Sequence, residues 1–457
     1  MNRRELLSMM GAGFGTVGLS GSLGAASRSM PASAGTPHFP ARAKHVIFLF
    51  LNGGLSQVDS FDPKPELDRH DGKPMPGPKI RTDSATGNLM KSPFRFRPRG
   101  ESGILVSEIF PRIGGLIDDF CVIRSMYSDN GNHVPSLYLM NSGHQLAGHP
   151  SMGSWITYGL GSENRNLPAF VVLCPGYPVG GPQLWSSAFL PNSYQGTYVP
   201  NNEIDPEKLV RNVRNSAFTP NQQRRQLALL DRLDRRYLDR VGHQPQLESG
   251  IQAMEVAFRM QMEAPLALDV TREEQSTRSR YGDTDFARGC LMALRLVEHG
   301  VRMVQIFYGK SQPWDSHDDI LDHRILAADA DRAIAALIQD LKARGLFEET
   351  LLIVGSEFGR TPMIQNSGLV KYGYGRDHNV HGYTTLLAGA GVRGGMTYGA
   401  TDDFGFKAVE DRVHPHDLHA TVLHLLGLDH TKLTYRYGGR DFRLTDVGGR
   451  VVEEILS

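Results

Sequence analysis

The chain has 457 residues, with 49 basic and 49 acidic side chains and therefore no formal net charge. This balance argues against a nucleic-acid-binding surface. Hydrophobic residues make up 40% of the chain, which is ample for a large core, and no stretch reaches the apolar length that a membrane span needs, so we expect no stable membrane insertion after processing.

The N-terminus resembles an export signal. Arg3 and Arg4 precede a mild apolar run, and Ala32-Ser33-Ala34 provides a small-x-small cleavage site. We therefore predict a twin-arginine export signal over residues 1–34, a mature domain over residues 35–457, and a periplasmic or extracellular location. The alternative is an ordinary disordered terminus that happens to carry two arginines.

Short apolar runs bounded by glycine or polar residues recur along the mature chain. They cover residues 45–51, 170–174, 301–308, 351–355 and 383–388, and their length is typical of strands buried on both faces. Two of them follow segments with helical periodicity, at residues 291–297 and 334–341. Strands that alternate with helices predict an α/β fold with a mostly parallel central sheet covered on both sides.

Residues 203–285 have a different pattern, which we interpret as a helical insertion. Two helix faces are expected there, one formed by Leu227, Leu230, Leu233 and Tyr237 and one by Ile251, Met254, Phe258 and Met262. Arginine and aspartate alternate on the outer side of the first, which favours a solvated face over a stripe that binds nucleic acid.

Carboxylates and imidazoles gather where the predicted strands end or begin. In an open parallel sheet, ligands bind outside the carboxyl ends of the strands. Asp315 and His317 follow one strand, Glu357 follows another, and His381 directly precedes a third. We expect these four side chains to converge in one pocket. Oxygen ligands suit Ca²⁺ or Mg²⁺ and imidazoles suit Zn²⁺ or Mn²⁺, so a divalent metal ion is predicted without its identity.

Several motifs resemble those of known hydrolases. His133-Val134-Pro135-Ser136, followed by Ser142-Gly143, resembles the sulfatase signature Cys-x-Pro-Ser-Arg with Thr-Gly at the same offsets. Ser356-Glu357-Phe358-Gly359 is similar to the Ser-Asp-His-Gly segment of the alkaline-phosphatase/sulfatase superfamily. From about residue 40 to about residue 446, the chain resembles the exported domain-of-unknown-function 1501 family, whose hallmarks are matched by Asn52-Gly53-Gly54, Asn132-His133, Met152-Gly153-Ser154-Trp155, Trp314-Asp315-Ser316-His317, Glu357-Phe358-Gly359-Arg360 and Asp377-His378-Asn379.

The resemblance implies an alkaline-phosphatase-like three-layer α/β/α fold and metal-dependent hydrolysis of sulfate or phosphate esters, with a small-molecule or polysaccharide ester as substrate. It implies that His378 or His381 supplies the late metal-binding histidine, alongside Asp315, His317 and Glu357. His133 takes the nucleophile position, and Arg360 would neutralise an oxyanion. Substrate contacts are expected from Asn52, Asn132, Trp314 and Asp377.

The departures from the superfamily pattern leave the reaction open. Position 133 carries histidine, so neither a formylglycine nor a hydroxyl nucleophile can arise there. Asn52 and Phe358 replace an anionic and an imidazole metal ligand. His133 could attack phosphorus, act as a general acid, bind metal or merely cap a helix. Its place before a helix predicts a neutral imidazole. The alternative function is a non-catalytic pseudo-enzyme that binds sulfated or phosphorylated polymers.

Overall fold

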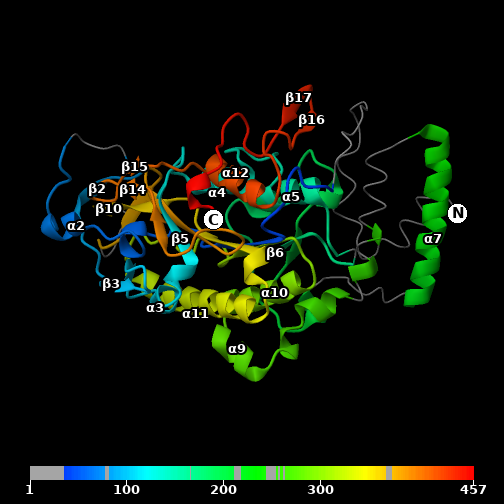
Figure 1. Cartoon of the computed structure of the whole chain (residues 1–457), viewed down its shortest axis with the longest axis horizontal. Coiled ribbons are helices and arrows are strands. Elements are labelled where there is room, and N and C mark those ends of the chain that lie inside the picture. The colour runs from blue at the N-terminus through cyan, green and yellow to red at the C-terminus, as the bar shows by residue number, and fades with distance from the viewer. Residues whose placement is uncertain are drawn as a thin grey trace.

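A sheet of eight strands forms the centre of the protein (Figure 1). The computed structural model describes residues 35–77, 82–164, 166–209, 218–242, 254–255, 258–260, 263–366 and 373–457. The predicted export signal, residues 1–34, lies outside the described residues. In the order in which they lie side by side, the strands are β13 (Met396–Tyr398), β5 (Phe120–Met126), β12 (Tyr383–Ala388), β9 (Thr350–Gly355), β1 (His45–Phe50), β8 (Met303–Phe307), β6 (Phe170–Leu173) and β7 (Thr197–Val199).

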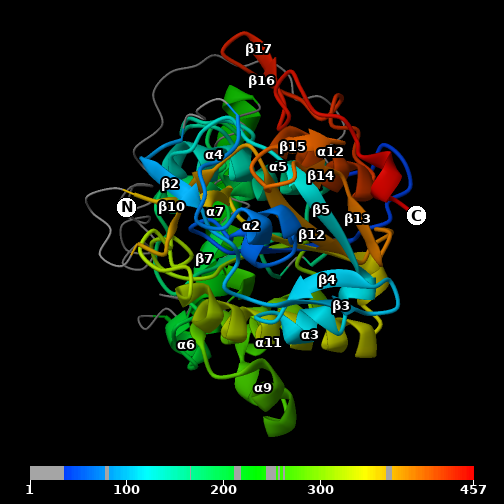
Figure 2. The same ribbon diagram turned by 90° about the vertical axis from the view of Figure 1, so that its left-hand side faces the viewer.

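Helices cover both faces of this sheet, as Figures 1 and 2 show from two directions. On one face lie α3 (Pro111–Gly114), α10 (Asp285–Glu298) and α11 (Asp322–Ala343); on the other lie α4 (His133–Ser142), α5 (Met152–Leu160) and α12 (Pro415–Leu425). Successive side chains of a strand point to opposite faces. Accordingly, Ile47 and Leu49 of β1 belong to the first core, and Val46 and Phe48 belong to the second. The predicted three-layer α/β/α architecture is confirmed.

Only β12 runs against its neighbours in the sheet. It pairs antiparallel with β5 and β9, whereas the other pairs, such as β1 with β8 and β9, are parallel. The start of β12 therefore lies at the edge where the parallel strands end. β11 (Arg376–Asn379) comes just before β12 and joins a second sheet in the order β11-β10-β2, with β10 (Gly359–Gln365) and β2 (Thr86–Leu89). This reversal brings residues 376–379 to the same edge as the loop after β8.

Smaller elements surround these layers. They are α2 (Pro65–Arg69), β3 (Phe96–Arg99), β4 (Ile104–Ser107), α6 (Pro206–Leu209), α7 (Pro220–Val241), α9 (Gln275–Tyr281), β14 (Ala400–Thr401), β15 (Ala408–Glu410), β16 (Tyr435–Tyr437) and β17 (Arg440–Phe442). Among the described residues, no helix combines the length and apolarity needed to cross a bilayer.

The helix predicted around residues 227–237 is α7, which stands apart from the sheet in Figure 1. Its predicted apolar face is only partly covered by described residues: Leu230 is 3% exposed, but Leu233 and Tyr237 are 43% and 45% exposed. The second predicted helix, residues 251–262, lies mostly outside the described residues.

Candidate metal centre

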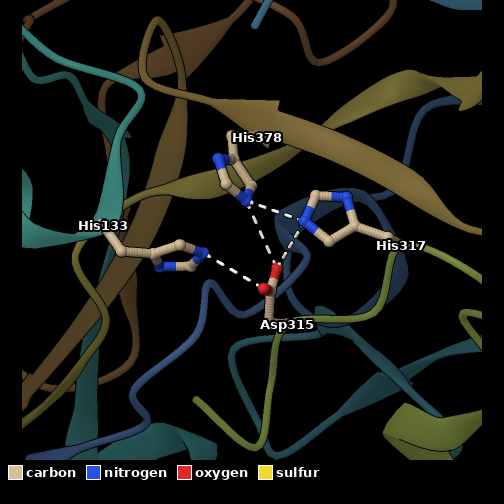
Figure 3. Close-up of side chains that lie close together, drawn as sticks. All are labelled: His133, Asp315, His317 and His378. Atoms are coloured by element: carbon tan, nitrogen blue, oxygen red, sulfur yellow. Dashed lines mark hydrogen bonds and ion pairs between the residues drawn. The ribbon is translucent and has the colours of Figure 1, made fainter. Parts of the chain in front are cut away.

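Four side chains from three distant segments converge at the carboxyl edge of the sheet (Figure 3). His133 is the first residue of α4, Asp315 and His317 lie in the loop after β8, and His378 lies in β11. One ligand atom from each of these residues lies within 4.8 Å of the other three. This group of His133, Asp315, His317 and His378 is called the metal centre below.

The spacing of these atoms matches that of ligands around a small cation. The Nε2 atoms of His317 and His378 lie 2.8 and 3.2 Å from Oδ1 of Asp315, and Nε2 of His133 lies 3.3 Å from its Oδ2. The two Nε2 atoms of His317 and His378 are 3.0 Å apart. Tetrahedral ligands about 2.0–2.2 Å from a Zn²⁺ ion are separated by about 3.3–3.6 Å. The contacts among Oδ1 of Asp315 and the Nε2 atoms of His317 and His378 are therefore near this separation, although slightly shorter.

The opposite nitrogen of each imidazole meets an acceptor. Nδ1 of His133 lies 2.7 Å from Oε1 of Glu357, and Nδ1 of His378 lies 2.7 Å from the carbonyl oxygen of Gly131. Nδ1 of His317 contacts Oε1 of Gln365. With Nδ1 as the donor to these acceptors, each Nε2 can present a lone pair to a bound ion. Such outer contacts are the usual way in which proteins fix metal-binding imidazoles.

Two observations indicate that the metal centre fits a cation. Nε2 of His133 is buried and contacts Oδ2 of Asp315 at 3.3 Å. The Nε2 atoms of His317 and His378 face each other at 3.0 Å, an arrangement that a positive ion between them would stabilise. Burial alone would raise the pKa of Asp315, but hydrogen bonds from the three histidines and the charge of Arg360 hold that pKa well below its usual range. The carboxylate is thus ionised and available as a ligand.

His133 lies between two carboxylates that favour its protonated form. Burial opposes protonation, yet the hydrogen bonds to Asp315 and Glu357 raise the pKa of His133 above its ordinary value. The prediction of a neutral imidazole, made from the helix N-terminus alone, did not take these two carboxylates into account and stays a prediction. The capping alternative is also excluded: the N-cap of α4 is Asn132, whose side chain accepts a hydrogen bond from the backbone N–H of Val134 at 3.1 Å.

Glu357, predicted as a metal ligand, contacts an imidazole and lies outside the metal centre. Its fully buried carboxylate accepts hydrogen bonds from the backbone N–H of Gly53 at 3.0 Å and from the hydroxyl of Ser356 at 2.9 Å, in addition to His133. The carboxylate of Glu357 therefore faces three hydrogen-bond donors, and the sequence pattern could not predict these contacts.

Arg360 is not placed to meet a substrate. Its side chain is fully buried and donates to the carbonyl oxygens of Gly54 at 3.0 Å and Arg376 at 3.2 Å. It also donates to Oδ1 of Asp315 at 2.7 Å. The guanidinium therefore holds Asp315 and the surrounding loops in position, which corrects the expectation that it neutralises an oxyanion.

The other predicted site residues lie outside the metal centre. His381 is exposed, and its ring packs on Phe406 at 5.2 Å. Asn52 is buried and donates to the carbonyl oxygen of Gly309 at 3.0 Å, and Trp314 is buried in the core. Asp377 is buried and accepts a hydrogen bond from the backbone of Ser84, which leaves only Asn132 exposed among the four expected substrate contacts.

Phe358 and Gly53 contribute to the centre in ways the sequence analysis did not predict. The ring of Phe358 lies 4.8 Å from that of His133 and 4.5 Å from that of His378, measured between centroids. Gly53 has a φ of +123°, and a Cβ there would lie 2.6 Å from the backbone nitrogen of Asp315. The sequence analysis singled out the Asn52-Gly53-Gly54 motif, but it could not show that Gly53 packs against the backbone of Asp315.

Residues 43–456 match the family described as "Protein of unknown function (DUF1501)". The chain belongs to this family. Among curated proteins, no match to this DUF1501 protein was found.

Solved structures similar to this DUF1501 protein include members of the alkaline-phosphatase/sulfatase superfamily. The lipoteichoic acid synthase LtaP from Listeria monocytogenes is 8% identical, with 89% of this chain and 76% of that chain covered and a TM-score of 0.38. The PsFucS1 sulfatase from Pseudoalteromonas sp. is 13% identical, with 85% and 68% covered and a TM-score of 0.35. A protein in the alkaline phosphatase superfamily from Vibrio parahaemolyticus is 10% identical, with 94% and 76% covered and a TM-score of 0.37.

Proposed function

We propose that this protein is a metal-dependent hydrolase of sulfate or phosphate esters, with one divalent ion held by His133, Asp315, His317 and His378. The observation that carries the proposal is that three imidazoles, each anchored through Nδ1, direct Nε2 toward one ionised carboxylate. Three nitrogen ligands favour Zn²⁺, Mn²⁺ or another transition metal over Ca²⁺ or Mg²⁺, which prefer oxygen.

The bound ion would polarise the ester oxygen and lower the pKa of an attacking water, which replaces the missing Cys, Ser or Thr nucleophile. The chain's own residues prepare this step. Arg360 holds Asp315 through a hydrogen bond of 2.7 Å. Phe358 places an apolar ring against the imidazoles of His133 and His378. The substrate class, a small-molecule or polysaccharide ester, is part of the proposal.

A binding protein without catalytic activity is the second candidate, and one observation favours it. All four ligand atoms at the metal centre come from the protein. Closed four-ligand sites are typical of structural zinc, whereas catalytic zinc usually keeps three protein ligands and an open position. For hydrolysis, the ion must expand its coordination or release one ligand.

Metal analysis combined with an ester assay distinguishes these outcomes. We expect the purified mature protein to hold one transition-metal ion per chain and to hydrolyse aryl phosphate or aryl sulfate esters. Chelation should abolish the activity, and adding back the ion should restore it. A stoichiometric ion without turnover would support the binding protein, and absence of a stoichiometric ion would overturn the metal centre itself.

We also propose that the protein is exported by the twin-arginine pathway and matures near Gly35. The proposal is supported by Arg3-Arg4 and the Ala32-Ser33-Ala34 site. Replacing both arginines with lysine should retain the unprocessed chain in the cytoplasm. Unchanged processing of that variant in cell fractions would refute the assignment.

A further inference from the structure

We propose that Glu357 is a positioning residue for the metal centre: it fixes the imidazole of His133 with Nε2 toward the ion and does not bind the ion itself. This inference rests on the proposed metal site and goes beyond it, because it assigns a role to a carboxylate that the sequence places among the ligands. The role follows from what surrounds Glu357.

The carboxylate of Glu357 is enclosed by hydrogen-bond donors. Oε1 meets Nδ1 of His133 at 2.7 Å, and both oxygens lie 3.0–3.1 Å from the backbone nitrogen of Gly53. Oε2 also accepts from the Ser356 hydroxyl at 2.9 Å. A side chain this buried and this fully bonded is held in one orientation, and that orientation presents it to the far nitrogen of His133.

The neighbours of Glu357 do not form a second cation site. The side-chain amide of Asn52 donates to the carbonyl oxygens of Gly309 at 3.0 Å and Ser311 at 2.6 Å. Phe358 offers only an apolar ring, which packs on His133 and His378. Within the described residues, the ligand atoms that gather closely enough for an ion belong to the metal centre, and Glu357 is not among them.

A carboxylate on the outer nitrogen of a metal-binding imidazole has a known physical effect. It fixes the tautomer and ring orientation and makes the ligand nitrogen more basic, and its loss typically weakens metal binding by about 10–100-fold. We expect this effect at His133, because its Nδ1 lies 2.7 Å from the fully buried carboxylate of Glu357, whereas Nδ1 of His378 lies 3.5 Å from the exposed carboxylate of Asp83.

The variant Glu357→Gln tests the inference without changing the shape of the side chain. The amide oxygen can still accept from His133 and Gly53. The amide nitrogen can donate to the hydroxyl of Ser356, which then donates to the carbonyl oxygen of Leu51 at 2.8 Å. We therefore expect a folded protein that binds Zn²⁺ about 10–100-fold more weakly. Its Co²⁺-substituted form should keep the absorption band positions of the wild type, because the ligand set is unchanged.

A double-mutant comparison shows whether Glu357 acts through His133. In a His133→Ala background, Glu357→Gln should have no further effect on Zn²⁺ affinity. Asp377→Asn is the matched control, because Asp377 is an equally buried carboxylate that accepts a hydrogen bond from the backbone N–H of Ser84, and it should leave the affinity unchanged.

The outcomes separate this inference from the proposed function. A wild-type protein that binds neither Zn²⁺ nor Co²⁺ overturns both. If the wild type binds normally and the Co²⁺ spectrum changes in Glu357→Gln, then Glu357 is a ligand. If Glu357→Gln still weakens Zn²⁺ binding in the His133→Ala background, then Glu357 does not act through the imidazole of His133. Either result, or an unchanged affinity in Glu357→Gln, overturns the positioning role alone.

Discussion

At the scale of single residues, two histidines that the sequence analysis places among the metal ligands differ in what their rings contact. His317 presents Nε2 to Asp315 at 2.8 Å, whereas His381 packs on Phe406 outside the metal centre. We expect His317→Ala to lower the affinity for Zn²⁺ at least about 100-fold, because one of four ligands is lost. His381→Ala is the control and should bind normally. Titration calorimetry measures both, and equal losses would show that His381 belongs to the site.

The contacts of the Arg360 side chain lead to a prediction about stability. A lysine at this position could keep a charge beside Asp315 but could not reach the carbonyl oxygens of Gly54, Trp314 and Arg376 together. A buried acceptor left without its donor costs about 1–3 kcal/mol, so Arg360→Lys should lower the free energy of unfolding by an amount of this order. Urea denaturation of the metal-free protein measures it. A loss of activity at unchanged stability would instead restore the oxyanion role.

At the scale of elements, α4 carries His133 on its first turn, and its N-cap sets where that turn begins. Asn132 accepts from the backbone N–H of Val134 at 3.1 Å. Asn132→Ala should destabilise the protein by about 1 kcal/mol, and Asn132→Ser should retain most of the stability. Thermal unfolding of the two variants compares them. If alanine and serine behave alike, the cap does not contribute.

The five predicted strands were found because each is a continuous apolar run buried on both faces. β5 was missed because Arg124 and Ser125 interrupt its apolar run, although Arg124 turns its guanidinium to the carbonyl oxygen of Phe61 at 2.9 Å. Asp315, His317 and His378 were recoverable from their positions at strand ends. The selection of His381 over His378 in the convergence prediction failed because both residues precede β12, and only the pairing of β11 with β10 decides which ring faces the site.

The roles of Glu357 and Arg360 could not be predicted for a different reason. Each follows β9 in a motif that resembles a ligand-bearing segment, so the sequence indicates the neighbourhood correctly. Their contacts depend on Gly53, Gly54 and Trp314, which lie in the loops after β1 and β8. Whether a charged side chain faces a ligand or a backbone carbonyl is decided by this tertiary packing.

At the scale of the whole molecule, buried histidines couple stability to pH. Burial lowers the pKa of His419 to about 3, and its Nε2 bonds to the carbonyl oxygen of Met140 at 2.9 Å. The unfolded chain binds a proton below about pH 6.5 and the native chain does not, so stability is complete above that pH and is lost as the pH falls toward about 3. The loss from this one fully buried group is about 1.4 kcal/mol per pH unit.

Replacing His419 with glutamine removes this titration while keeping a donor for Met140. We therefore expect the stability of His419→Gln to fall less steeply than that of the wild type between about pH 6 and about pH 4. Urea midpoints at several pH values measure the slopes. Parallel slopes would mean that other groups, such as His144, whose pKa burial lowers to about 4, dominate the acid sensitivity.

The metal centre draws its ligands from three stretches that are far apart along the chain and meet only in the finished sheet. The unfolded polypeptide holds no preformed site, so an ion bound there would be acquired during or after folding. Intrinsic affinity for such nitrogen and oxygen ligands generally rises from Mn²⁺ to Cu²⁺. The identity of the ion bound to the purified protein would then indicate which metal ions were available in the compartment where the chain folded. A manganese or iron ion would point to a compartment in which copper and zinc are scarce.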